Sequence, residues 1–186
     1  MSVIIASVLL PFLPETPIQL LVEGLLYDFG QLTLPFDNVD EEYLRKPRKF
    51  DMQGLKHFML FMGPLSSAFD LIVFAGLWFL FKVRDVATFQ TVWFTYSIVS
   101  NLFGMHIIRT AKLPFVQSNA HKMVYFSSIL LCLLGILVPF TWLGNIIGLV
   151  PIPLYLLTLI IGVPILYCIV AIFAKKIYEK KYGEWI

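Results

Sequence analysis

Residues 19–50 read QLLVEGLLYDFGQLTLPFDNVDEEYLRKPRKF, and this stretch decides what kind of protein the chain is. Its first half is apolar enough for a membrane helix, yet it contains Glu23 and Asp28. A carboxylate in hydrocarbon costs about 2.5–3.5 kcal/mol on insertion scales, so a retained one indicates a functional site. The second half turns into a densely charged loop. We therefore predict a membrane helix with functional acids, followed by a segment in water.

The composition indicates a membrane protein. The chain has 186 residues, of which 59% are hydrophobic, and its mean hydropathy is +0.82. A soluble core of this size does not need so much apolar surface. The net charge of +2 is too small to indicate nucleic-acid binding. Cys132 and Cys168 are far apart in apolar segments and form no CxxC motif, so we interpret them as buried membrane cysteines.

The apolar segments predict an all-α membrane protein, a helical transmembrane bundle with a partial first helix and five spanning helices. The first segment is shorter than the roughly 20 residues that a crossing needs, so it resembles the distal half of a helix. We expect a single domain over residues 1–186 that includes a charged loop at 37–56. The predicted helical segments cover residues 1–13, 17–36, 55–81, 91–108, 123–142 and 154–174, followed by a charged tail.

The lysines and arginines predict the orientation of the chain in the membrane. Of the 14 in the sequence, all but Lys82 and Arg84 lie near the loops after the second and fourth helices or in the C-terminal tail. Positive charge concentrates in cytoplasmic loops, so the C-terminus is predicted to be cytoplasmic. Trp78, Trp93 and Trp142 fall near span ends, where tryptophans anchor helices at the membrane interface.

A candidate cation site lies on the second segment. Residues three and four apart share one face of a helix, so Gly24, Asp28 and Gln31 form a stripe. Asp28 offers a carboxylate and Gln31 an amide oxygen, which are ligands that a hard divalent cation prefers. Gly24 is a position where the helix could loosen and turn carbonyls inward. Alternatively, Asp28 pairs with a polar side chain of another span, such as Asn101. Glu23 lies at the edge of the stripe, either beside the site or facing water.

Asp70 is a second acid within a predicted span, with Ser66 four residues away on the same face. Either it makes structural hydrogen bonds or it belongs to an ion path. His106, close to a predicted span end, is interpreted as structural. An intramembrane enzyme that used His106 and Asp70 would lack a nucleophile. The sequence contains no HExxH, GxSxG, Walker or CxxC motif, so we expect no hydrolase or nucleotide site within it.

The loop at 37–56 mixes acidic and basic residues, and Pro47 prevents a long helix in it. It is either a solvated linker or a docking surface for a cytoplasmic domain.

Several motifs together resemble those of one family. They are PFLPETPIQLLVEGLLYD, LPFDNVDEEYLRKPRKFD, GPLSSAFD, MHIIRT, LPFVQS and KKYGEWI. With them the whole chain closely resembles the C-terminal membrane region of bacterial magnesium-translocating P-type ATPases. The resemblance implies that the first segment is the distal part of the family's fifth transmembrane helix and that the others are its sixth to tenth. The charged loop then abuts the phosphorylation domain.

The resemblance also implies the ligands. In P-type pumps the sixth helix carries an Asn and, four residues later, an Asp that bind the transported ion. Asp28 matches that Asp, whereas the Asn position falls on Gly24, with Glu23 beside it.

By the same resemblance the chain takes part in moving Mg²⁺ across the bacterial plasma membrane as a multi-pass protein. ATP hydrolysis would depend on phosphorylation, nucleotide-binding and actuator domains and on helices one to five. These domains and the rest of helices one to five lie outside this sequence, from which the DKTGT motif is absent. The alternative is an autonomous small membrane channel, or an accessory subunit without ATPase activity.

Overall fold

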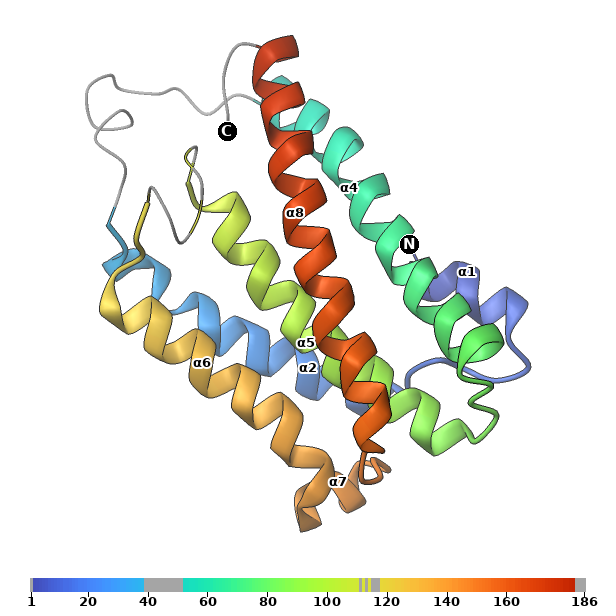
Figure 1. The fold of residues 1–186 in the computed structure, drawn as a ribbon. Coiled ribbons are helices and arrows are strands. Elements are labelled where there is room, and N and C mark those ends of the chain that lie inside the picture. Colours follow the sequence, from blue (N-terminus) through green and yellow to red (C-terminus); the bar gives the residue numbers. More distant parts are fainter. Residues whose placement is uncertain (1, 39–51, 111, 113, 115–117, 183–186) are drawn as a thin grey trace.

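The protein is a bundle of helices, as the sequence predicts. The computed structural model describes residues 2–38, 52–110, 112, 114 and 118–182, and no strand is assigned within these ranges (Figure 1). The longer helices are α1 (Ser2–Leu9), α2 (Pro17–Gln31), α4 (Met52–Ala75), α5 (Val86–Ile108), α6 (Lys122–Leu137) and α8 (Leu157–Tyr182). The shorter elements are η1 (Leu34–Phe36), η2 (Gly76–Leu80), η3 (Val138–Phe140), α7 (Trp142–Ile146) and η4 (Leu154–Leu156).

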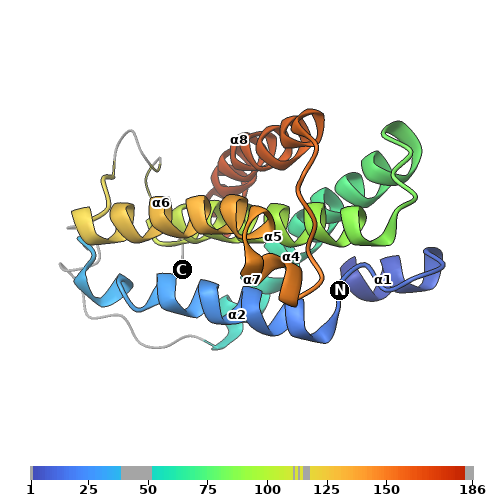
Figure 2. The ribbon, with the colours of Figure 1, turned by 90° about the horizontal axis from the view of Figure 1, so that it is seen from below.

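Helix α5 is the centre of the bundle. It packs against α2, α6 and α8, while α4 packs against α8 and α1 packs against α4. Seen from below, α2 and α8 lie on opposite sides of α5 (Figure 2). Because neighbours cover it, α5 buries residues around its whole circumference, including the polar side chains of Gln90, Thr91 and Thr95. A helix buried all round has no need of a single apolar stripe.

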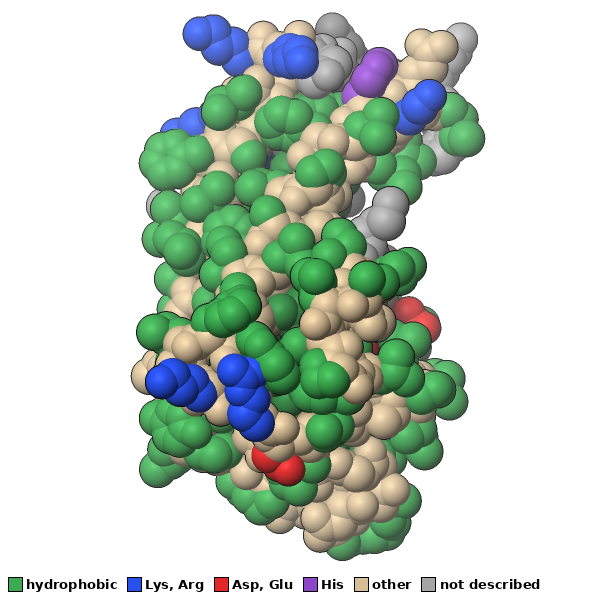
Figure 3. Space-filling model, turned by 90° about the vertical axis from the view of Figure 1, so that its right-hand side faces the viewer, with side chains coloured by type: hydrophobic (Ala, Val, Ile, Leu, Met, Phe, Trp, Pro, Cys, Tyr) green, Lys and Arg blue, Asp and Glu red, His purple; other side chains and the backbone are tan. Residues whose placement is uncertain are grey.

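The surface of the bundle is apolar, which agrees with a membrane protein. Three described helices are long and apolar enough to cross a bilayer: Met52–Leu80, Lys122–Phe140 and Leu154–Lys181. Many large hydrophobic side chains on them face outward. On the face drawn in Figure 3, Lys and Arg side chains gather in two groups separated by a mostly hydrophobic band.

The two other predicted spans differ from these three. Helix α2 has 15 residues, which correspond to about 22 Å of helix, less than the roughly 30 Å of a hydrocarbon core. Helix α5 has 23 residues and is long enough, but its buried polar side chains lower its hydropathy. The all-α membrane fold is confirmed, and the crossing of the bilayer by α2 and α5 stays a prediction.

Two helix starts are fixed by side-chain caps. Thr16 and Gln19 form a capping box at α2, and Pro17 occupies the first helical position, which favours proline. At α5, the Asp85 carboxylate accepts hydrogen bonds from the backbone nitrogen and hydroxyl of Thr88, at 2.8 and 2.6 Å. The prediction that this helix starts at residue 91 was therefore wrong by five residues, because Asp85 is its N-cap.

The C-terminal helix extends beyond the predicted span end at residue 174. Helix α8 continues to Tyr182, so most of the predicted tail is helical. The Lys175 side chain, at the predicted span end, is only 3% exposed. Its ammonium group donates to the backbone carbonyls of Thr110 and Lys112. This contact holds the end of α8 against the connection between α5 and α6.

Candidate ion site

The predicted stripe on α2 lies on the uncovered side of the bundle. Gly24, Asp28 and Gln31 are all exposed, and α2 is a continuous helix through Gly24. A β-carbon built on Gly24 meets nothing within 4 Å, whereas on Gly30 it would come within 2.8 Å of the Leu131 side chain. Helix α2 therefore packs closely on α6 at Gly30 and leaves its other face open.

Glu23 lies on the covered face instead, about 140° around the helix from Asp28. Its Oε1 accepts hydrogen bonds from the Ser97 hydroxyl at 2.5 Å and from the Asn101 amide at 3.1 Å. The alternative in which Asp28 pairs with Asn101 is thus contradicted, because Asn101 is bound to Glu23. Glu23 is 7% exposed, so it does not face water.

Asp70 occupies a third position, between α1, α4 and α5. Its carboxylate accepts hydrogen bonds from the Ser2 hydroxyl at 2.6 Å and from the Tyr96 hydroxyl at 3.4 Å. Ser66, which the sequence placed on the same face, donates to the Gly63 carbonyl and not to Asp70. Asp70 therefore links three helices by hydrogen bonds, and its place in an ion path stays a prediction.

Glu15 belongs to the buried acids and was missed by the sequence analysis. It lies in the turn before α2, is 8% exposed, and accepts a hydrogen bond from the Trp93 indole at 3.3 Å. Trp93 is itself 3% exposed and stacks on Phe74, so its prediction as an interfacial anchor was wrong. The signal was present in the sequence, because Glu15, Gln19 and Glu23 recur every four residues.

The described residues do not by themselves assemble a complete cation shell. No three His, Cys, Asp or Glu side chains among them lie close enough together to hold a metal ion. Asp28 and Gln31 supply oxygens to one side only, and the predicted ligand set of Asp28, Gly24, Gln31 and Glu23 is split between two faces of α2. Any ion bound at Asp28 would need further ligands from elsewhere.

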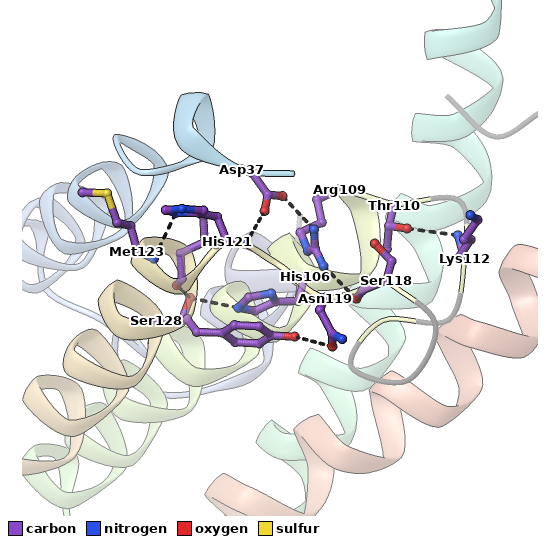
Figure 4. A network of polar contacts seen from close by, with 12 residues as sticks. Asp37, His106, Arg109, Thr110, Lys112, Ser118, Asn119, His121, Met123 and Ser128 are labelled. Atoms are coloured by element: carbon purple, nitrogen blue, oxygen red, sulfur yellow. Dashed lines mark hydrogen bonds and ion pairs between the residues drawn. The ribbon is translucent and has the colours of Figure 1, made fainter. Parts of the chain in front are cut away.

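A polar network joins Asp37, which follows η1, to the end of α5 and the start of α6 (Figure 4). The Arg109 guanidinium donates to Asp37 at 2.7 Å, and the other Asp37 oxygen accepts from the His121 backbone nitrogen at 2.8 Å. The side chains of Arg109 and Asp37 are only 5% and 11% exposed. Arg109 also donates to the Ser118 carbonyl. This buried ion pair fixes the point at which the chain leaves η1.

His106 lies beside this network and bonds to Ser128. The His106 Nε2 atom and the Ser128 hydroxyl are 2.9 Å apart, and the imidazole stacks on Tyr125 (Figure 4). These contacts join α5 to α6, in agreement with a structural histidine. The charged loop lies at residues 39–51 for the most part, outside the described residues, and its docking role is untested.

The chain matches a known protein family and several named relatives. Residues 12–177 match the family described as "Cation transporting ATPase, C-terminus". A magnesium-transporting ATPase, P-type 1, of Salmonella typhimurium LT2 is 42% identical over 187 residues, which cover 99% of this chain and 21% of the relative. The protein of the same name from Escherichia coli K12 is 36% identical over 185 residues. The chain thus spans about a fifth of the length of these relatives.

Proposed function

Because the chain belongs to the family of cation-transporting ATPase C-terminal regions, we propose that it is part of the membrane domain of a magnesium-transporting P-type ATPase. In this proposal Mg²⁺ is the transported substrate, and the chain supplies part of its path across the bacterial plasma membrane. ATP hydrolysis would require phosphorylation, nucleotide-binding and actuator domains outside these 186 residues.

The observation that carries the proposal is the uncovered face of α2. It exposes Asp28 together with the large apolar side chains of Leu21, Leu25 and Phe29. A carboxylate that faced lipid here would cost about 2.5–3.5 kcal/mol. Further helices of the pump packed on this face would remove both the carboxylate and the apolar side chains from lipid.

Asp28 is the best candidate to bind the ion. Mg²⁺ takes oxygen ligands, keeps several waters and is commonly held by one or two carboxylates. Asp28 provides one carboxylate, and Gln31 and the backbone at Gly24 share its face. The remaining ligands would come from the helices that cover this face.

The topology forms part of the proposal. Lys175 joins α8 to the connection between α5 and α6, and Asp37, which follows η1, binds Arg109 and His121 at the two ends of that connection. Together with the charged loop at 37–56, these segments carry every lysine and arginine except Lys82 and Arg84, so we place them, with the C-terminus, in the cytoplasm. An autonomous channel or accessory subunit is not favoured, because 99% of the chain aligns within a much longer transporting ATPase.

The proposal is tested in the intact pump that carries this chain. Asp28→Ala and Asp28→Asn should each abolish the growth rescue of a magnesium-uptake-deficient bacterium at low Mg²⁺, with normal amounts of protein in the membrane. Glu179→Gln, which changes a carboxylate in the last turns of α8, is the matched control and should rescue as wild type does. Full rescue by both Asp28 variants would remove Asp28 from the ion path.

A further inference from the structure

The segment between α6 and α8 has properties that the magnesium proposal does not use. This α6–α8 connection covers residues 138–156 and contains η3, α7 and η4. It joins two of the helices that are long and apolar enough to cross a bilayer, so it lies at a membrane surface. Helix α7 lies at the end of the bundle opposite to the last turns of α8 (Figure 1).

The α6–α8 connection carries no charge, although it occupies the position of a loop in water. Residues 123–174 contain no Asp, Glu, Lys, Arg or His. The connection between η2 and α5 lies beside it, since the rings of Phe81 and Tyr155 are 5.9 Å apart. That neighbouring connection includes residues 82–85, which read KVRD. Two connections at one end of the bundle therefore differ in chemistry, and only the charged one is suited to water.

Helix α7 exposes large apolar side chains on one side. Trp142 is 69% exposed and Ile146 is 65% exposed, and Leu143 is exposed beside them. At 100° per residue, these three side chains occupy a sector of about 100° around the helix. The exposed polar residues Thr141 and Asn145 lie outside this sector. A helix with one apolar and one polar side is typical of a segment that lies in a membrane interface.

The α6–α8 connection is held against the bundle by hydrogen bonds to two helices. The buried Gln19 amide of α2 donates to the Ile147 carbonyl at 3.1 Å. The Val150 backbone nitrogen donates to the Thr91 hydroxyl of α5 at 3.0 Å. The connection is thus fixed to the first turns of α2 and α5, and the apolar side of α7 remains exposed.

The surroundings of α7 indicate lipid as the partner of its apolar side. The exposed apolar surface continues from α7 onto both adjoining spans, where Leu137 is 53% exposed and Leu154 is 80% exposed. Tyr155 is also exposed. Tryptophan and tyrosine are enriched where a membrane meets water, because their rings are apolar and their N–H or O–H groups are polar. Trp142 and Tyr155 therefore have the chemistry of this boundary.

We propose that the α6–α8 connection is an interfacial anchor whose partner is the phospholipid surface. Helix α7 lies in the outer leaflet, at the boundary between headgroups and acyl chains. The side chains of Trp142, Leu143 and Ile146 insert among the acyl chains, and Asn145 faces the headgroups. The choice of leaflet rests on the orientation given in the proposed function, whereas the insertion itself does not.

The test measures the depth of α7 with nitroxide spin labels on the intact protein in phosphatidylcholine vesicles. Oxygen concentrates in hydrocarbon and a nickel chelate stays in water, so the ratio of their collisions with the label reports depth. This ratio should be several-fold higher for a label on Ile146→Cys than for the matched label on Asn145→Cys. Lys82→Cys, in the charged connection, should resemble Asn145→Cys. The unsubstituted protein, treated with the same label, supplies the background from Cys132 and Cys168.

Brominated phospholipids give a second measurement that needs no label. Bromines attached near the headgroup end of the acyl chain should quench tryptophan fluorescence of the wild-type protein. Trp142→Phe should lose a large part of this quenching, because Trp142 is the most exposed of the described tryptophans. Since phenylalanine is also apolar, we expect the variant to fold.

Three results would overturn the proposal. A label on Ile146→Cys that the chelate reaches as freely as it reaches Asn145→Cys would show a loop in water. A label that neither reagent reaches would show that another part of the protein, or a second copy, covers α7. Equal quenching of wild type and Trp142→Phe would remove Trp142 from the lipid. These readouts need neither Mg²⁺ nor transport, so failure of the Asp28 proposal would leave them unaffected.

Discussion

The two faces of α2 carry acids in opposite situations. Glu23 faces α5 and is bound by Ser97 and Asn101, whereas Asp28 lies on the uncovered face. Six residues beyond the end of α2, directly after η1, Asp37 is held by Arg109 and His121. The difference teaches that an acid in an apolar segment indicates function only after its partners are known. Glu23 and Asp37 hold helices together, whereas the Asp28 side chain is exposed on the uncovered face of α2.

The largest loss of stability is expected at the nearly buried ion pair between Arg109 and Asp37. Arg109→Met should lower the stability of the detergent-solubilised protein by about 3–5 kcal/mol, because it leaves the nearly buried Asp37 carboxylate without its counter-charge. Thermal unfolding measures the change. The double variant Arg109→Met/Asp37→Leu should recover much of the loss, since no buried charge remains. Equal instability of the single and double variants would show that the ion pair is not the cause.

The next prediction concerns one glycine on each face of α2, Gly30 on the covered face and Gly24 on the uncovered face. Gly30→Leu should lower the free energy of unfolding by about 1–3 kcal/mol, because its added side chain meets Leu131 and Leu102 of the neighbouring helices. The matched variant Gly24→Leu adds the same side chain into open space and should not be destabilising. Similar melting temperatures for the two variants would contradict the packing of α2 described here.

A third prediction compares the acids themselves. Glu23→Ala should destabilise the protein by about 1–3 kcal/mol, because the Ser97 and Asn101 donors lose their buried acceptor. Asp28→Ala should leave the melting temperature nearly unchanged while it abolishes magnesium-dependent growth rescue. The substitution on the covered face would thus lower stability, whereas the substitution on the uncovered face would abolish growth rescue without lowering stability. A melting temperature lowered equally by both substitutions would remove this distinction.

The smallest expected effect is on the pH dependence of stability. Burial raises the pKa of Glu15 above its ordinary value, so the folded protein binds this proton more tightly than the unfolded chain does. Stability should therefore fall as pH rises through the raised pKa. Glu15→Gln should flatten this part of the profile, measured as melting temperature against pH. An unchanged slope in the variant would assign the dependence to another group.

Much of the fold follows from the sequence, because hydropathy and charge placement act on whole segments. The helical segments and the membrane class were both predictable. The end of α8 was not predictable. A lysine at the end of a span is expected to be solvated, and only the structure shows that Lys175 binds carbonyls of the α5–α6 connection. The spacing of Asp85 and Thr88 is typical of an N-cap, so the start of α5 could have been predicted from the sequence.

The site was only partly predictable, for a physical reason. Helical periodicity places Asp28 and Glu23 on different faces, but it does not say which face packs inside. That choice depends on the neighbours of α2, here the polar residues Ser97 and Asn101 of α5, which lie more than 70 residues away in sequence. The burial of Glu15 depends likewise on the contact between the turn before α2 and the Trp93 indole of α5.

The buried Lys175 has a consequence for how such a membrane domain could move. Its ammonium group donates hydrogen bonds to the carbonyls of Thr110 and Lys112. Sliding of α8 along its axis would therefore break both contacts at once. The C-terminal helix and the α5–α6 connection should therefore travel as one rigid body through a transport cycle. A covalent cross-link between them should leave turnover intact, whereas one that ties the open face of α2 should arrest it.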